Sequence, residues 1–158
     1  LRKLKTAECI KFPKRVDGSL LIHNLTSVKD VVFPKYVGGW IDLSKLTTAE
    51  STVFPEHTDG SLFMNMNKLT TAKDVVFPKH VEGHLALSSL ITANNVILPR
   101  YIGTYLDLSA LHSLKDIILP EYVGGKIAYK NQLYNLSELK EIQQQEKNKR
   151  FVKYKQNL

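Results

Sequence analysis

The chain places a proline at nearly constant intervals along most of its length, and this regularity restricts the folds open to it. Each proline follows a Phe or a Leu, and the six are Pro13, Pro34, Pro55, Pro78, Pro99 and Pro120. The intervals between them are 21, 21, 23, 21 and 21 residues. Self-similarity at such a period indicates a solenoid, in which each repeat forms one coil and packs on its neighbours.

Alignment on the prolines gives the unit V-x-F/L-P-x-x-V-x-G-x-L-x-L-x-x-L-x-T-A, which occurs complete about five times, with partial copies at both ends. Apolar residues alternate at a period of two within each unit, which predicts a short strand with these side chains on one face. The alternating pairs are Leu20/Ile22, Ile41/Leu43, Leu85/Leu87, Leu106/Leu108 and Ile127/Tyr129. We predict that equivalent strands stack into a parallel sheet over a continuous core, with the prolines at corners between strands.

Two further columns of residues suggest how the coil turns. A glycine precedes each strand (Gly18, Gly39, Gly60, Gly83 and Gly125), which fits a tight bend that needs a positive φ. A column of short polar residues comprises Thr6, Ser27, Thr48, Thr71, Thr92, Ser113 and Asn135. We expect this column to form a ladder that satisfies backbone groups at a buried turn.

The third copy of the unit is two residues longer than the others and is expected to be the irregular coil. An insertion of two residues preserves the alternation of a strand, so Leu62, Met64 and Met66 are all predicted to face inward. A local bulge is the alternative.

The motif L-x-L-x-x-(N/L)-x-x, followed after a short return by L-P, resembles the leucine-rich repeat superfamily over residues 1–139. It is most similar to short bacterial repeats with an L-P-x-x-L/V return segment. The resemblance implies a right-handed coil with a parallel sheet whose outer face binds ligands. The usual asparagine position instead holds Leu25, Leu46, Leu69, Leu90 and Leu111. The Thr/Ser column is expected to replace the asparagine ladder, and a flatter β-solenoid is the alternative.

The chain divides into a solenoid over residues 1–139 and a C-terminal cap helix with a basic tail over residues 140–158. Asn135, followed three residues later by Glu138, predicts a helix N-terminus. A helix over residues 136–150 would cover the last coil with Leu136, Leu139 and Ile142, and residues 150–155 read as a tail. The first residues already lie inside a repeat, so a cap or further coils are expected upstream.

The net charge of +7 is concentrated at the C-terminal end. Residues 140–158 contain six Lys or Arg against two Glu. Lys147, Lys149, Arg150, Lys153 and Lys155 are therefore candidates for binding nucleic acid or another anionic surface. A solvated end that only aids solubility is the competing interpretation.

Residues that alternate with the apolar ones on each strand should point to solvent, and they vary from coil to coil. They form three columns: Ser19, Trp40, Ser61, His84, Tyr105 and Lys126; Leu21, Asp42, Phe63, Ala86, Asp107 and Ala128; and His23, Ser44, Asn65, Ser88, Ser109 and Lys130. Exposed aromatic residues contribute strongly to interfaces. The candidate partner-binding residues are therefore Trp40, Asp42, Phe63, His84, Tyr105 and Asp107.

Two more columns lie outside these strands. Arg15, Tyr36, His57, His80, Tyr101 and Tyr122 are expected to stack at a corner in a structural role. His57 and His80 lack the Cys or carboxylate partners of a metal site, so no metal is predicted. Val32, Val53, Val76, Ile97 and Ile118 form an apolar stripe. The stripe is a second binding or association surface if the return segment is a strand, and otherwise a corner that turns these residues partly inside.

No catalytic or cofactor-binding pattern is present in the sequence. Asp42 and Asp107 are expected roughly 14 Å apart, three coils at ~4.8 Å each, whereas paired-carboxylate chemistry needs about 5–9.5 Å. No apolar run approaches the length of about 18 residues that a membrane helix needs. The lone Cys9 favours a reducing compartment, which suits a cytoplasmic protein or a secreted bacterial effector.

The sequence therefore predicts a non-catalytic module, without cofactor, that binds another protein through the outward strand residues. Such a module would suit the targeting part of a larger bacterial protein. Anion binding by the basic C-terminal end and a purely structural or self-assembling solenoid are the alternatives. The partner and the oligomeric state are left open.

Overall fold

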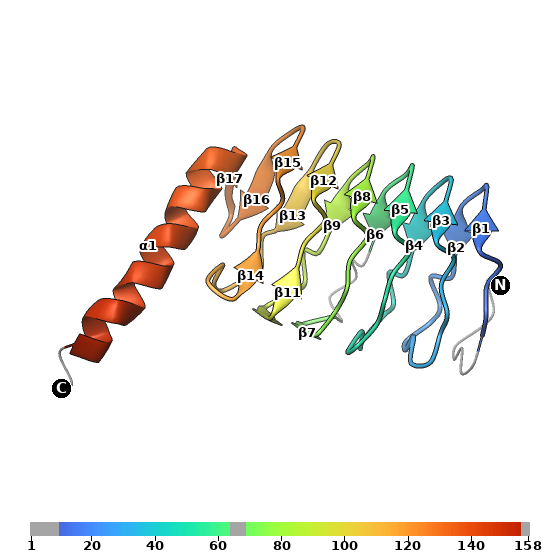
Figure 1. The fold of residues 1–158 in the computed structure, drawn as a ribbon, viewed down its shortest axis with the longest axis horizontal. Helices are drawn as coiled ribbons and strands as arrows, with labels where there is room; N and C mark the ends of the chain where they lie inside the picture. Colours follow the sequence, from blue (N-terminus) through green and yellow to red (C-terminus); the bar gives the residue numbers. More distant parts are fainter. Residues whose placement is uncertain (1–9, 64–68, 156–158) are drawn as a thin grey trace.

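The computed structural model describes residues 10–63 and 69–155 and shows a β-solenoid of about five coils with one C-terminal helix (Figure 1). A six-stranded sheet with all strands parallel runs along one side. Its order is β1 (Arg15–Val16), β3 (Tyr36–Val37), β5 (His57–Thr58), β8 (His80–Val81), β12 (Tyr101–Ile102) and β15 (Tyr122–Val123). The predicted solenoid with parallel sheets and a terminal helix is confirmed.

A second sheet of seven strands lies behind the first and is built from the predicted alternating segments (Figure 1). In chain order its strands are β2 (Leu20–Leu21), β4 (Ile41–Asp42), β6 (Leu62–Phe63), β9 (Leu85–Ala86), β13 (Leu106–Leu108), β16 (Ile127–Tyr129) and β17 (Gln132–Tyr134). β17 alone is antiparallel, and the turn before it uses positive φ values of 48° at Lys130 and 60° at Asn131. This hairpin ends the stack at the helix.

Shorter parallel pairings link the coils along their return side. β7 (Thr71–Lys73) pairs with β10 (Thr92–Asn94), and β11 (Val96–Ile97) pairs with β14 (Ile117–Ile118). Single bridges extend the same two rows, and they are Ser27 to Thr48, Lys11 to Val32, Val53 to Val76 and Val76 to Ile97. Most successive coils are thus paired on the return side of the solenoid as well as in the two main sheets.

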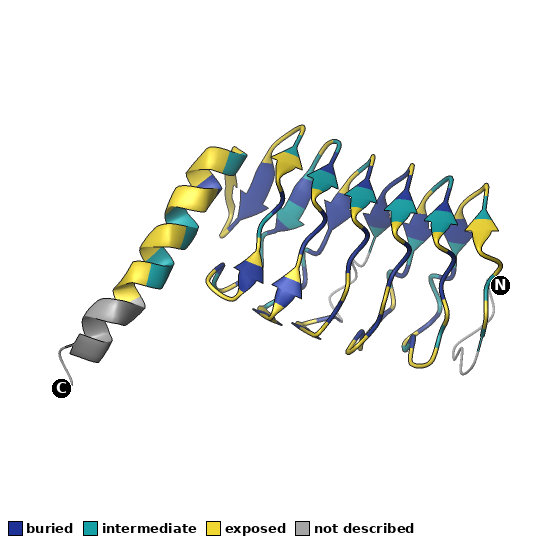
Figure 2. Cartoon of the chain, in the orientation of Figure 1, coloured by how far each residue is buried: buried dark blue, intermediate teal, exposed yellow. Residues whose placement is uncertain are grey.

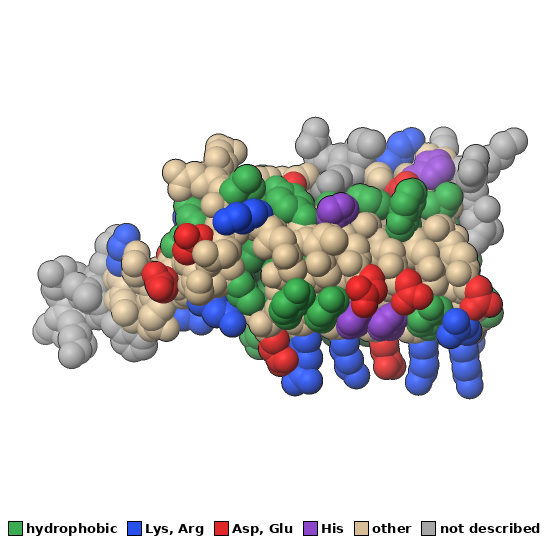
Figure 3. Space-filling view, turned by 90° about the horizontal axis from the view of Figure 1, so that it is seen from above, with side chains coloured by type: hydrophobic (Ala, Val, Ile, Leu, Met, Phe, Trp, Pro, Cys, Tyr) green, Lys and Arg blue, Asp and Glu red, His purple; other side chains and the backbone are tan. Residues whose placement is uncertain are grey.

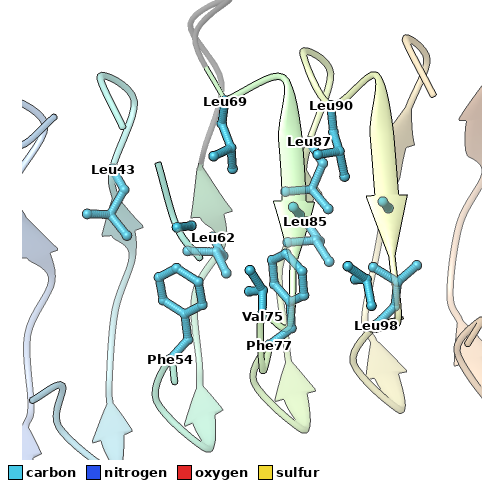
Figure 4. Close-up of a cluster of buried hydrophobic side chains, with 14 of the residues drawn as sticks. Leu43, Phe54, Leu62, Leu69, Val75, Phe77, Leu85, Leu87, Leu90 and Leu98 are labelled. Atoms are coloured by element: carbon cyan, nitrogen blue, oxygen red, sulfur yellow. The ribbon is translucent and has the colours of Figure 1, made fainter. Parts of the chain in front are cut away.

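The inward side chains form one continuous core, as the alternation predicted (Figures 2 and 4). The leucines at the position of the usual asparagine are all buried: Leu25, Leu46, Leu69, Leu90 and Leu111. The residues before the first prolines stack inside the core, with ring centroids 5.3 Å apart for Phe33 and Phe54 and 5.8 Å for Phe54 and Phe77. Each proline lies two residues before a strand of the six-stranded sheet, which confirms its corner position.

The prediction that glycines supply positive φ values is wrong, because no described glycine has one. Several of the glycines instead lie against the preceding coil: a Cβ atom on Gly60 would lie 2.6 Å from the Gly39 carbonyl oxygen, whereas one on Gly18 would meet nothing within 4 Å. Glycines outside the predicted column are equally close to their neighbours. A Cβ atom on Gly103 would lie 2.0 Å from the Glu82 carbonyl oxygen, and one on Gly38 would lie 2.4 Å from the Asp17 carbonyl oxygen. The left-handed conformation occurs instead in a column of short polar residues, with φ of 59° at Asp30, 54° at Ser51, 53° at Asp74 and 54° at Asn95.

The expected buried ladder is wrong for its threonines, whereas the half-buried Ser27 and Ser113 do accept hydrogen bonds from backbone amides, those of Lys29 and Lys115, at 3.3 Å. Thr48, Thr71 and Thr92 are exposed, whereas the apolar residue after each of them is buried. Neighbouring residues of a strand point to opposite faces, so burial of Ala49, Ala72 and Ala93 turns the threonines outward. Leucines fill the interior instead. In the longer third copy Leu62 is buried as predicted, while Met64 and Met66 lie outside the described residues.

Helix α1 (Leu136–Lys155) closes the C-terminal end of the core. Its predicted N-terminus is confirmed, since the Glu138 amide donates to Asn135 Oδ1 at 2.9 Å and the Asn135 amide donates to Glu138 Oε2 at 2.7 Å. Leu139 is fully buried, and Leu136 and Ile142 pack against the core. Residues 150–155, predicted as a tail, continue the helix.

In the described part of the chain no helix combines the length and apolar character needed to cross a membrane.

Glu146 fastens the middle of this helix to the last coils. Its Oε1 accepts from the Tyr129 hydroxyl at 2.7 Å and from Lys130 Nζ at 3.0 Å, and its Oε2 accepts from the Leu114 amide at 2.7 Å. Burial by itself would raise the pKa of Glu146. The hydrogen bonds, that from Tyr129 first, outweigh burial and lower the pKa to about 2. Burial raises the pKa of Tyr129 to about 12, which keeps its hydroxyl a donor.

We expect Gly103→Ala to lower the free energy of unfolding by about 1–3 kcal/mol, because its methyl group would overlap the Glu82 carbonyl oxygen. Gly18→Ala is the matched control, since a Cβ there meets nothing within 4 Å and its φ is not left-handed. Urea unfolding should show no loss for the control. Equal losses in both variants would contradict the close-approach explanation.

We expect Glu146→Gln to lower the free energy of unfolding near neutral pH by about 1–3 kcal/mol, since it removes a charged acceptor of several hydrogen bonds. Because the folded-state pKa is depressed, the stabilisation is present above the ordinary value of 4.5 and is lost as the pH falls towards 2. Unfolding measured across this range should therefore depend less on pH in the variant. Glu141→Gln, at an exposed position of the same helix, should behave as wild type.

Candidate interaction surfaces

Aromatic side chains on the outer face of the seven-stranded sheet form two edge-on pairs. Trp40 is 58% exposed and meets Phe63 of the next coil with ring centroids 6.3 Å apart at 88°. His84 and Tyr105 meet in the same way at 6.1 Å and 79°. Trp40 lies over Gly60, where a Cβ atom would come within 2.4 Å of Trp40 Cδ1. We refer to Trp40, Phe63, His84 and Tyr105 as the aromatic face.

Some residues predicted to point to solvent on this sheet are instead covered. Ser61, Ala86 and Ala128 are buried, because these small side chains lie below larger neighbours on adjacent coils. Ser61 Oγ accepts a hydrogen bond from the His84 amide at 2.9 Å, and Ser19 Oγ accepts one from the Trp40 amide at 3.0 Å. Each serine thus holds the backbone of an aromatic residue one coil further on, a role that sequence reasoning missed.

The two aspartates of the predicted site are half-buried, Asp42 as the last residue of β4 and Asp107 in the middle of β13. Asp42 Oδ1 accepts from the Ser44 amide at 3.0 Å, and Asp107 Oδ1 accepts from the Ser109 amide at 3.0 Å. Each aspartate therefore closes a local turn through one carboxylate oxygen. Asp42 lies in β4 and Asp107 in β13, separated by β6 and β9. The structure does not bring these two carboxylates together.

The predicted corner stack is confirmed as an unbroken row along the six-stranded sheet. Arg15 Cζ lies 3.9 Å from the centroid of the Tyr36 ring. The following centroid distances are 5.5 Å for Tyr36–His57, 4.4 Å for His57–His80, 4.3 Å for His80–Tyr101 and 4.9 Å for Tyr101–Tyr122, with interplanar angles between 8° and 17°. We call this row the corner stack.

Acidic side chains hold the rings of the corner stack in place. Asp59 Oδ1 lies 2.8 Å from His57 Nε2, and Glu82 Oε1 lies 2.6 Å from His80 Nε2. Hydrogen bonds from the Tyr36 hydroxyl first, and then from His57, lower the pKa of Asp59. Among the described residues no three His, Cys, Asp or Glu side chains are grouped so that they could hold a metal ion. The two histidines therefore belong to the stack.

A row of charged residues beside the corner stack was not recognised from the sequence (Figure 3). It consists of the residue after each proline: Lys14, Lys35, Glu56, Lys79, Arg100 and Glu121. Glu56 contacts Lys35 at 3.9 Å and Lys79 at 4.0 Å, and Arg100 contacts Glu121 at 3.2 Å. These exposed pairs contribute little stability individually, but they match opposite charges between adjacent coils.

The Val/Ile stripe, whose exposure the sequence left open, faces solvent. Val32, Val53, Val76, Ile97 and Ile118 are each 50–60% exposed. Backbone bridges link the stripe residues from Val53 through Val76 and Ile97 to Ile118, and a separate bridge links Val32 to Lys11. Among these described residues Val32 and Val53 are not bridged, so the ladder is interrupted between them. A groove of about 860 Å³ opens at this interruption, lined by residues 27–35 and parts of 48–56.

The predicted anion-binding residues Lys147, Lys149, Arg150, Lys153 and Lys155 all belong to α1. Lys147 is half-buried and Lys149 is exposed. Anion binding by this end of the chain stays a prediction.

Comparison with protein-family models, with curated proteins and with solved structures finds no match to this chain. Its surfaces are therefore interpreted from their own geometry and chemistry.

We expect His80→Ala to lower the free energy of unfolding by about 1–2 kcal/mol, because it removes two ring contacts from the middle of the corner stack. His80→Phe keeps a ring in that place and should recover most of the loss, although it cannot contact Glu82. Urea unfolding of both variants tests this. Equal stability of the Ala and Phe variants would show that stacking contributes nothing.

Proposed function

We propose that this chain is a non-catalytic recognition module that binds a partner protein through the aromatic face, with Asp42 and Asp107 as polar contacts. The observation that carries the proposal is the placement of Trp40, Phe63, His84 and Tyr105 on successive coils in edge-on pairs. Aromatic side chains supply large contact areas with little loss of conformational entropy, and they dominate the energetics of many interfaces.

The positions of the residues in the aromatic face are already set in the unbound chain. Backbone pairing between strands sets the spacing of the four aromatic residues, and Ser19 and Ser61 hold the amides of Trp40 and His84. Preorganisation of this kind reduces the entropy lost on binding. It favours a binding surface over side chains that only cover the sheet.

Asp42 and Asp107 add charge to an otherwise apolar surface. Each uses Oδ1 to close its own turn, which fixes the carboxylate while its second oxygen can accept from a partner. Fixed charges at the edge of an aromatic cluster contribute to the choice of partner more than to affinity. The partner is therefore expected to present donors, such as Lys or Arg, next to apolar residues.

The proposal extends to the kind of repeat. The L-x-L strand followed by the L-P return supports a relationship to leucine-rich repeats of the short bacterial type, in which the sheet face is the usual ligand surface. The leucines at the asparagine position are a departure from that pattern. By the same analogy, the chain suits the targeting part of a larger bacterial protein or effector.

We expect the combined variant Trp40→Ala, Phe63→Ala, Tyr105→Ala to lose partner binding while its melting temperature stays close to that of wild type. The three side chains are exposed or half-exposed on the outer face, so their removal takes little from the core. Affinity capture from the native host, followed by binding measurements with the purified partner, tests this. Tyr122→Ala, at an exposed aromatic residue on the other sheet, serves as the control. Undiminished capture by the triple variant would refute the proposed surface.

A further inference from the structure

We propose that the Val/Ile stripe is a self-association surface, on which a second copy of this chain packs stripe against stripe as a twofold dimer. The stripe lies on the return side of each coil and shares no residue with the aromatic face. Association of two copies through the stripe would leave the partner-binding surface of each copy accessible.

The first argument is the concentration of exposed apolar side chains. Five of the eight large hydrophobic residues that are exposed in the described part of the chain form the stripe, and the other three are Trp40, Tyr122 and Leu133. One lies on each of five successive coils, so the stripe extends over roughly 19 Å at ~4.8 Å per coil. Single exposed apolar residues are ordinary, but a contiguous row of them marks an interaction surface.

The coil itself does not require apolar residues at these positions. The inward places beside them are already filled by Phe33, Phe54, Phe77 and Leu98, all of which are buried. A β-branched polar residue such as Thr would suit an exposed strand position equally well. The repeated Val or Ile at these positions is therefore explained by a binding partner that covers the stripe.

The charges around the stripe favour a second copy as its occupant. Flanking positions hold six cationic and six anionic side chains, all exposed: Lys29, Lys35, Lys73, Lys79, Arg100 and Lys115 with Asp30, Glu50, Glu56, Asp74, Asp116 and Glu121. The two flanks are thus neutral along the five coils of the stripe, although the whole chain carries +7 and Lys11 and Lys14 lie beyond the Val32 end. A neutral rim gives no attraction for an anionic membrane or for nucleic acid, and it removes the repulsion between two identical basic chains.

The order of these charges also fits a twofold arrangement. The positions three residues after the stripe hold Lys35, Glu56, Lys79, Arg100 and Glu121 in order. A twofold axis in the interface at right angles to the stripe, through its middle residue, brings this side of one copy against the same side of the other in reverse order. Lys35 then faces Glu121 and Glu56 faces Arg100, while Lys79 meets its own equivalent.

The size of the stripe sets the strength of the dimer. An apolar patch of this length amounts to a few hundred Å². Two such patches bury on the order of 1,000 Å² in total, at or below the lower limit of stable, specific interfaces. The dimer should therefore be weak, and its population should depend strongly on protein concentration.

Sedimentation velocity over a wide concentration series tests the proposal. Wild-type protein should pass from monomer to dimer as the concentration rises. The combined variant Val53→Thr, Val76→Thr, Ile97→Thr should raise the dimer dissociation constant by at least about tenfold, because it removes apolar contacts from both copies. Leu133→Thr, at an exposed aliphatic residue on β17 outside the stripe, should leave the dissociation constant unchanged.

Three outcomes would overturn the proposal. The first is a wild-type chain that stays monomeric at every concentration, and the second is a dimer that the threonine variant leaves intact. The third is a monomeric chain that co-floats with phosphatidylserine vesicles in a flotation assay, with the threonine variant failing to do so. If the threonine variant fails to fold, Lys35→Glu with Arg100→Glu should weaken the dimer at low salt, because both changes place like charges opposite Glu121 and Glu56 of the second copy. Dimerisation must survive in the Trp40→Ala, Phe63→Ala, Tyr105→Ala variant, which separates this surface from the aromatic face.

Discussion

Backbone hydrogen bonding between equivalent residues of successive coils is the interaction on which the rest of this structure depends. The register places Tyr36 opposite His57 and Ile41 opposite Leu62, so each position of the repeat becomes a row. A row of leucines becomes core, a row of rings becomes the corner stack, and a row of valines becomes the stripe. Close approach of the coils also leaves no room for a Cβ atom at Gly38, Gly60 and Gly103.

Much of this architecture could be predicted from the sequence because burial leaves a strong periodic signal. Leu85 and Leu87 must face inward, and the proline interval fixes the length of a coil. The conformation of the turns could not be predicted in the same way. Gly60 signals either a positive φ or a close contact, and only the position of Gly39 in the preceding coil distinguishes them. Likewise, Thr71 is exposed because Ala72 beside it is buried.

The candidate site was predicted only in part. The aromatic residues were identified as outward-facing, since their positions follow from alternation along each strand. Their edge-on pairing depends on offsets between coils, and the serines that hold Trp40 and His84 act from a coil that is about twenty residues distant in sequence. The charge pairing of Glu56 with Lys35 and Lys79 likewise becomes visible only when the coils are stacked.

The interruption of the ladder between Val32 and Val53 has a consequence for how this molecule comes apart. In a linear array of repeats, stability is a sum of terms for single repeats and for contacts between nearest neighbours. At this junction, between the coil that begins at Val32 and the coil that begins at Val53, the described residues pair through β3–β5 and β4–β6 but share no bridge on the return side, whereas the junctions before and after it each have two return-side pairings. Fraying should therefore begin at this junction, with amide protons exchanging there before those of the central coils, while the helix-capped end stays closed.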